Sequence, residues 1–184
     1  HLRKIGGTMF NLNFKIWSFV LFLAVMLFSC ASDEVTKAKK LIQVKAYDQA
    51  IQLLEREIQD SPNNSRAHFM LANVFACKAI NEKEKEYIKK ALATYKSAIL
   101  INSENPTFYY NLGALQYLSG NTNDAIENLK KAVDLRSDCY GAMFILSQIY
   151  KNQKNEDKYQ RYFGDGLKLI NLQGDKIRLK YLEN

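Results

Sequence analysis

Few side chains in this sequence are suited to catalysis or metal binding, and they stand far apart. Cysteines occur at positions 30, 77 and 139, and histidines at positions 1 and 68. A structural zinc site needs about four Cys, His or carboxylate ligands at short spacings, and no such cluster is present in this sequence. We therefore predict no metal and no cofactor, and we interpret His68 as a packing residue.

Gly164-Asp165-Gly166 is the remaining short motif of chemical interest, since glycine-rich loops can bind phosphate groups. A phosphate loop follows a strand and opens a helix. This motif instead falls at the end of a helical pattern, with Tyr162, Phe163 and Leu167 as expected core residues. The sequence also offers no nucleophile and base that helical spacing would bring together. We predict that the chain is not an enzyme.

Cys30 ends an apolar run, and this position indicates a different chemistry. The run from Ile16 to Phe28 is 13 residues long and follows Lys15. It fits a signal-peptide core of about 7–15 residues better than a membrane span of about 20. Leu27-Phe28-Ser29-Cys30 resembles a bacterial lipobox, although Phe28 departs from the small residue usual there. The resemblance implies that the Cys30 thiol is diacylated, the chain is cut before it, and the new amine is acylated.

An uncleaved anchor helix and a plain secretory cleavage are the alternatives to lipidation. Under the lipoprotein interpretation, residues 1–29 are upstream residues and a signal peptide, with Met9 as the start of translation. The residues before Met9 fit no signal-peptide pattern, and Gly6-Gly7 fits a translated purine-rich ribosome-binding site.

The net charge of +7 gives little support to nucleic-acid binding. Arg3, Lys4 and Lys15 precede Cys30 with no acidic residue, and the other 23 basic residues stand against 19 acidic ones. Because these charges alternate along the chain, we expect solvated helix faces and no nucleic-acid partner. The 8 glycines and 2 prolines suit long helices better than many short strands.

After Cys30, two kinds of apolar segment recur at fixed spacing. The residues that open the second kind are spaced by 41, 34 and 34: Ala50, Ala91, Ala125 and Tyr159. The residues that align the first kind are spaced by 34, 41 and 34: Lys37, Leu71, Leu112 and Leu146. One seven-residue insertion, Asn81–Tyr87, reconciles both series with a unit of 34 residues. Helical apolar spacing within the segments predicts one helix–turn–helix hairpin per unit.

These hairpins resemble the tetratricopeptide repeat (TPR), most clearly in the second and third units. The matching residues are Leu71, Ala72, Phe75, Ala91, Tyr95 and Ala98, then Tyr109, Leu112, Gly113, Ala125 and Ala132. The first unit carries Glu34 and Lys37 at core positions, and the fourth has Tyr159 in place of a small residue. The resemblance implies an all-α fold, a right-handed α-solenoid of about four TPR repeats after the signal segment.

The repeat pattern also gives boundaries. We place the lipidated N-terminus and a degenerate first repeat at 30–64, the second repeat at 65–105, the third at 106–139, a degenerate fourth at 140–172, and a capping tail at 173–184. The tail is expected to form a short helix through Ile177, Leu179 and Leu182. The insertion is expected to add one turn to each helix of the second hairpin, as a solvated extension or, alternatively, a docking site.

The same arrangement separates Cys77 from Cys139. They fall at opposite ends of parallel helices, on the order of 20 Å apart, and a disulfide requires Cα atoms within about 7 Å. We expect no disulfide between them and interpret both as small hydrophobic residues.

In TPR proteins the first helices of the hairpins line a concave surface that binds proteins. Here Phe69, Tyr110 and Phe144 recur in one slot of that surface, and the residues on the following turns complete a predicted partner-binding groove: Asn73, Tyr117, Gln148 and Lys151. Rigid rings beside amides suit an extended peptide or a partner helix. The alternative is that these rings pack between neighbouring helices.

The sequence therefore predicts a membrane-anchored TPR lipoprotein in a bacterial cell envelope, on the non-cytoplasmic side, which acts as a protein–protein scaffold or adaptor. Its partner is a protein or peptide, and its contact with the membrane is through lipid. Self-association through an open end of the solenoid is one alternative. An accessory subunit of an envelope enzyme or assembly machine is another.

Overall fold

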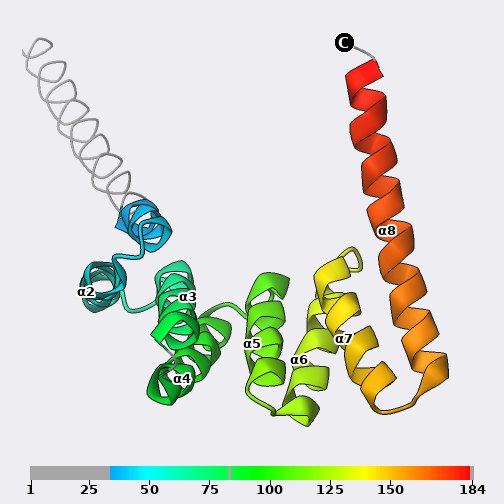
Figure 1. Cartoon of the computed structure of the whole chain (residues 1–184). Coiled ribbons are helices and arrows are strands. Elements are labelled where there is room, and N and C mark those ends of the chain that lie inside the picture. The colour runs from blue at the N-terminus through cyan, green and yellow to red at the C-terminus, as the bar shows by residue number, and fades with distance from the viewer. Residues whose placement is uncertain (1–33, 83, 183–184) are drawn as a thin grey trace, which may run out of the picture.

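The computed structural model describes residues 34–82 and 84–182, and every regular element in these ranges is an α-helix (Figure 1). A helical segment over 34–43 comes first. The helices that follow are α2 (Tyr47–Asp60), α3 (Ser65–Glu82), α4 (Lys85–Ile101), α5 (Pro106–Leu118), α6 (Thr122–Leu135), α7 (Tyr140–Asn152) and α8 (Glu156–Leu182). None of these described helices is both long enough and apolar enough to span a bilayer.

The helices form four successive antiparallel hairpins, and each hairpin packs mainly on its neighbours (Figure 1). The pairs are 34–43 with α2, α3 with α4, α5 with α6, and α7 with α8. This confirms the predicted all-α stack of helix–turn–helix units. In such a stack, stability is close to a sum of unit and interface contributions.

Small residues allow close contact between paired helices, and Gly113 shows this most directly. A Cβ atom placed on Gly113 of α5 would lie 2.8 Å from Leu129 Cγ and 3.2 Å from the Ala125 carbonyl oxygen, both on α6. Leu112, Ala125 and Leu129 are buried beside this contact. The absence of a side chain at Gly113 therefore sets how closely α5 and α6 approach.

The turns inside three hairpins share one backbone conformation. Gly120, between α5 and α6, has a φ of 88°, and Lys45 and Lys154 at the equivalent positions have φ values of 59° and 57°. This left-handed region is easily reached by glycine and costs other residues about 1–2 kcal/mol. The sequence identifies the turn at Gly120, where the residue type matches the conformation, but gives no such signal at the two lysines.

The insertion lengthens both helices of the second hairpin. Helix α3 has 18 residues and α4 has 17, whereas α5 has 13 and α6 has 14. A helical turn contains 3.6 residues, so the prediction of about one extra turn on each helix is confirmed.

The C-terminal segment differs from the prediction. Helix α8 runs without a break for 27 residues, so residues 173–182 continue it and do not form a separate short helix. The motif Gly164-Asp165-Gly166 lies inside α8, not at the end of a helix. One glycine in a helix interior costs only about 1 kcal/mol, which neighbouring turns can offset. Figure 1 shows α8 extending past the end of α7.

Candidate functional site

The three aromatic residues of the predicted groove are half-buried and contact neighbouring helices. Phe69 stacks on Phe108 of α5, with ring centroids 4.8 Å apart. Tyr110 lies so close to α7 that a Cβ on Gly141 would be 3.0 Å from its hydroxyl oxygen. Phe144 meets the edge of Phe163 on α8 at 5.8 Å. Each ring therefore packs between helices, the alternative that the sequence left open, while part of it remains accessible.

The polar residues of the predicted groove fall into two groups. Asn73 accepts a hydrogen bond from the Tyr95 hydroxyl at 2.6 Å, and Asn152 Nδ2 donates to the Tyr117 hydroxyl oxygen at 3.3 Å. Burial raises the pKa of Tyr95. Gln148 and Lys151 are exposed, and the Lys151 ammonium lies 5.5 Å from the centroid of the Tyr159 ring. Asn73 and Tyr117 are thus engaged within the fold, whereas Gln148 and Lys151 face solvent.

Cys77, Cys139 and His68, the other residues considered for chemistry, are at least partly buried and pack within the fold. Within the described residues Cys77 is half-buried and Cys139 buried, and neither forms a disulfide. Burial raises the pKa of the Cys77 thiol. His68 Nε2 donates to the Pro62 carbonyl oxygen at 3.0 Å, which fastens the start of α3 to the turn before it. Cys30 lies outside the described residues.

One expected core residue is wrongly assigned. Leu167 has 40% of its surface exposed, and Ile170, one turn further along α8, is exposed to the same extent. Tyr162 and Phe163 are half-buried, so they pack as expected. Leu167 is exposed because α8 is the second helix of the last described hairpin and packs on α7, so no further described hairpin covers its outer face.

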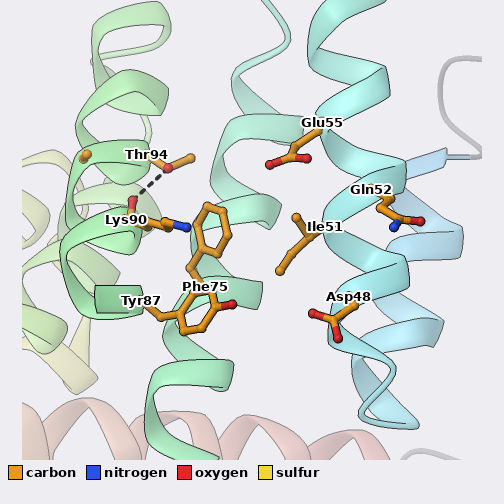
Figure 2. A pocket seen from close by; sticks show the side chains of 9 residues that line it. Asp48, Ile51, Gln52, Glu55, Phe75, Tyr87, Lys90 and Thr94 are labelled. Carbon is orange, nitrogen blue, oxygen red and sulfur yellow. Dashed lines mark hydrogen bonds between the residues drawn. The ribbon is translucent and has the colours of Figure 1, made fainter. Parts of the chain in front are cut away.

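A cavity that the sequence analysis missed lies between α2 and α4, with α3 behind it (Figure 2). We call it the α2–α4 groove. Its volume is about 480 Å³, and its lining residues are Asp48, Ile51, Gln52 and Glu55 of α2, Phe75 of α3, and Tyr87, Lys90, Ala93 and Thr94 of α4. It involves the second helices of two hairpins, whereas the predicted groove residues belong to first helices.

Two stacked rings form the back of this groove. The centroids of Phe75 and Tyr87 are 5.9 Å apart and the ring planes differ by 27°. The Lys90 ammonium lies 5.2 Å from the Tyr87 centroid and 6.0 Å from that of Phe75. Figure 2 shows Ile51, Asp48 and Glu55 pointing from α2 toward these rings. The groove therefore has an aromatic back, a wall with two carboxylates, and one cation opposite.

A buried lysine fixes one end of the groove. Lys78 of α3 is 6% exposed. Its ammonium forms an ion pair with Asp48 and lies 3.6 Å from a Glu82 carboxylate oxygen and 4.8 Å from the centroid of the Tyr87 ring. The hydrogen bond to Asp48 raises the pKa of Lys78, and burial acts in the opposite direction. This contact holds α2 against the lengthened end of α3.

Two signals for the groove are present in the sequence. Asp48, Ile51 and Glu55 are spaced so that they share one face of α2, and Tyr87 is the last residue of the insertion. Both segments also fit solvated surface, so their spacing gave no reason to pair them. In the part of the chain that the structure describes, no three His, Cys, Asp or Glu residues are placed to hold a metal ion.

The fold is that of an all-α TPR-type solenoid. Residues 83–120 match the family model described as TPR repeat. A crystal structure of MamA is similar, with a TM-score of 0.68, 17% identity, and coverage of 79% of this chain and 81% of that one. A structure of MamA from Desulfovibrio magneticus RS-1 has a TM-score of 0.65, 18% identity, and coverage of 78% and 77%.

A third similar structure is that of Pseudomonas aeruginosa pilF. Its TM-score is 0.65 at 22% identity, and the match covers 76% of this chain and 60% of that one. No curated protein matches the sequence. At these identities the similarity establishes the fold.

Proposed function

We propose that this chain is a protein-binding scaffold whose predicted groove receives an extended peptide or a helix of a partner. The supporting observation is the row of Phe69, Tyr110 and Phe144, whose rings are fixed on one side by a neighbouring helix and remain partly accessible. Rings that are already ordered lose little conformational entropy on binding. Gln148 and Lys151 add exposed polar groups on the fourth hairpin that can bond a partner backbone or carboxylate.

Binding at the predicted groove is best tested by substituting an exposed residue, because such a substitution leaves the packing of the helices intact. Lys151→Glu alters the exposed rim of the predicted groove, and Lys131→Glu makes the same change in charge at an exposed site on α6. Cross-linking in native membranes, followed by mass spectrometry, should show a partner that is captured by wild type and by Lys131→Glu but lost with Lys151→Glu. If all three proteins capture the same set equally, the groove does not bind the partner.

We also propose that the scaffold is held by lipid on Cys30, on the non-cytoplasmic side of a bacterial membrane. The support is the apolar run and the lipobox-like segment that precede Cys30. Stable anchoring requires more than one acyl chain, which diacylation of the thiol and acylation of the amine would supply. Radiolabelled palmitate should mark the wild-type chain and a Cys77→Ser control but not Cys30→Ala. Equal labelling of Cys30→Ala would refute this anchor.

Self-association is the second candidate function, and one observation favours it. Leu167 and Ile170 are each 40% exposed and lie one turn apart on α8, which continues beyond its partner α7 (Figure 1). A second copy of the chain would cover these residues. Sedimentation velocity should then show a concentration-dependent dimer that Ile170→Lys weakens, whereas a wild-type monomer at high concentration would exclude it.

A further inference from the structure

We propose that the α2–α4 groove is a second binding site, separate from the predicted groove, and that it takes a basic side chain together with an adjacent apolar side chain from a partner protein. Arginine is the basic residue that fits best. The proposal goes beyond the scaffold function because it concerns a different face of the hairpins and specifies the chemistry of the segment that binds there.

The charges that face the groove favour a basic group. Glu55 points into the cavity (Figure 2), and no other described residue forms a hydrogen bond or ion pair with it. Asp48 lies two helical turns earlier on the same wall and forms an ion pair with Lys78. Its side chain is nevertheless 79% exposed, so it remains open to solvent. The α2 wall therefore offers acceptors and unneutralised negative charge. An arginine guanidinium donates hydrogen bonds to a carboxylate in a fixed planar geometry.

The two lysines beside the groove already interact with other side chains of the chain. Lys78 is paired with Asp48 and Glu82, and the Lys90 ammonium lies over the rings of Tyr87 and Phe75. An acidic ligand would have to draw Lys90 away from both rings and would approach Glu55 and Asp48 as a like charge. A basic ligand placed against the α2 wall meets neither of these costs, and the like charge nearest to it is Lys90, which lies on the opposite, α4 side of the groove (Figure 2). Charge complementarity thus favours a positively charged occupant over a negatively charged one.

The apolar part of the site supplies a place for the neighbouring side chain. Ile51 points from α2 toward the rings of Phe75 and Tyr87 (Figure 2), and Ala93 lines the same cavity. The volume of about 480 Å³ lies within the range of pockets that hold small ligands or a few side chains. An apolar residue next to the arginine can therefore pack against Ile51 and the ring edges while the guanidinium reaches Glu55.

Peptide arrays test this assignment with defined probes. Each peptide carries a fixed Leu or Phe, and the adjacent positions vary among Arg, citrulline, Gln and Glu; citrulline has the shape of arginine without its charge. The full-length chain in mild detergent should prefer Arg over citrulline by about fivefold, the value of one partly exposed ion pair. Glu55→Gln should abolish this preference and Glu55→Lys should shift it toward Glu. Both changes are at an exposed position, so folding is not at risk.

Glu127→Lys is the matched control, because Glu127 is an exposed glutamate on α6 outside the groove and the net charge changes equally. It should leave the preference for Arg unchanged. Methyl NMR with labelled isoleucine gives a second measurement, in which the bound Arg peptide shifts the Ile51 signal. The proposal is overturned if wild type shows no charge preference, if Glu127→Lys acts as strongly as Glu55→Lys, or if Ile51 does not shift.

The identity of the occupant is tested separately. If wild type forms a dimer in sedimentation and Glu55→Lys alone abolishes it, the groove holds a second copy of this chain and the assignment to another protein is wrong. Lys151→Glu is expected to leave the peptide preference intact. A failure of the scaffold proposal at the predicted groove is thereby distinguished from a failure at the α2–α4 groove.

Discussion

Gly113 offers a direct test of how the hairpins are held together. Replacing it with alanine would place a Cβ 2.8 Å from Leu129 Cγ and 3.2 Å from the Ala125 carbonyl oxygen. Leu129 is fully buried, and the contact involves the branch carbon of its side chain, which cannot move aside without shifting the whole residue. The paired helices α5 and α6 must therefore separate or distort.

Two opposing effects set the magnitude. Overpacking in a well-ordered core costs about 1–3 kcal/mol, and the short contact with an immobile atom places this site in the upper part of that range. Alanine in place of glycine within a helix returns about 1 kcal/mol. We expect Gly113→Ala to lower the free energy of unfolding by about 1–2 kcal/mol, which corresponds to a fall in melting temperature of roughly 5 °C for a chain of this size.

The assay is urea and thermal unfolding followed by circular dichroism, with Gly164→Ala as the matched control. Gly164 is also inside a helix, α8, but a Cβ there meets nothing within 4 Å. This substitution should stabilise the chain by up to about 1 kcal/mol. If Gly113→Ala is as stabilising as Gly164→Ala, the absence of a side chain at Gly113 is not required for the close approach of α5 and α6.

A double variant separates the steric cost from other effects. Leu129→Ala removes the atom nearest to the new Cβ and by itself should cost about 2–5 kcal/mol by creating a cavity. On that background, Gly113→Ala should become neutral or stabilising, since the 2.8 Å contact no longer exists. Additive effects of the two substitutions would contradict the proposed contact.

Three further predictions concern single side chains. Tyr95→Phe removes the 2.6 Å hydrogen bond to Asn73 and should cost about 1 kcal/mol in urea unfolding at neutral pH. Burial raises the pKa of Tyr95 in the folded chain, so the stability that its neutral phenol contributes is complete below the unfolded pKa of about 10 and is lost as pH rises through the folded pKa. Above about pH 10 the Phe variant should therefore lose less stability than wild type, and an equal loss in both proteins would contradict this reasoning. The raised pKa of Lys78 acts in the same direction, so Lys78→Met should also flatten the loss of stability above about pH 10.4, whereas an unchanged slope would show that the Asp48 pair contributes nothing. Lys154→Gly should stabilise the chain by about 1 kcal/mol, because the φ of 57° suits glycine. Lys131→Gly, at an exposed position inside α6, should destabilise it by a similar amount.

The period of the repeats and the pairing of helices could be predicted because each depends on residues close in sequence. Gly113, Ala91 and Ala125 mark the contacts between paired helices, and Gly120 marks a turn. The lengthened hairpin follows from the number of inserted residues, which contain no glycine or proline. Continuity of α8 was missed because its glycines and the change of pattern at residue 173 resemble a helix end.

The candidate sites were harder to predict because they depend on contacts between hairpins. The ring of Phe69 is recognisable as part of a repeated slot, but its stacking on Phe108 requires the relative placement of α3 and α5. The ion pair of Lys78 with Asp48 joins residues 30 positions apart. A charged residue on each of two amphipathic helices is typical of solvated surface, so nothing in the spacing of Lys78 and Asp48 indicates that they pair.

The α2–α4 groove and the insertion are physically connected, and a deletion can show it. The insertion supplies Tyr87, which stacks on Phe75 and contacts Lys78 and Lys90; it also supplies Glu82, the second carboxylate beside Lys78. Removing residues 81–87 restores the 34-residue period, so we expect a folded chain with two shorter helices. Binding of the arginine peptides should weaken, because one ring of the aromatic back is lost, while partner capture at the predicted groove persists. A deletion variant that keeps both its fold and its full affinity for the arginine peptides would show that the insertion does not build the groove, and the carboxylate wall of α2 would then account for binding by itself.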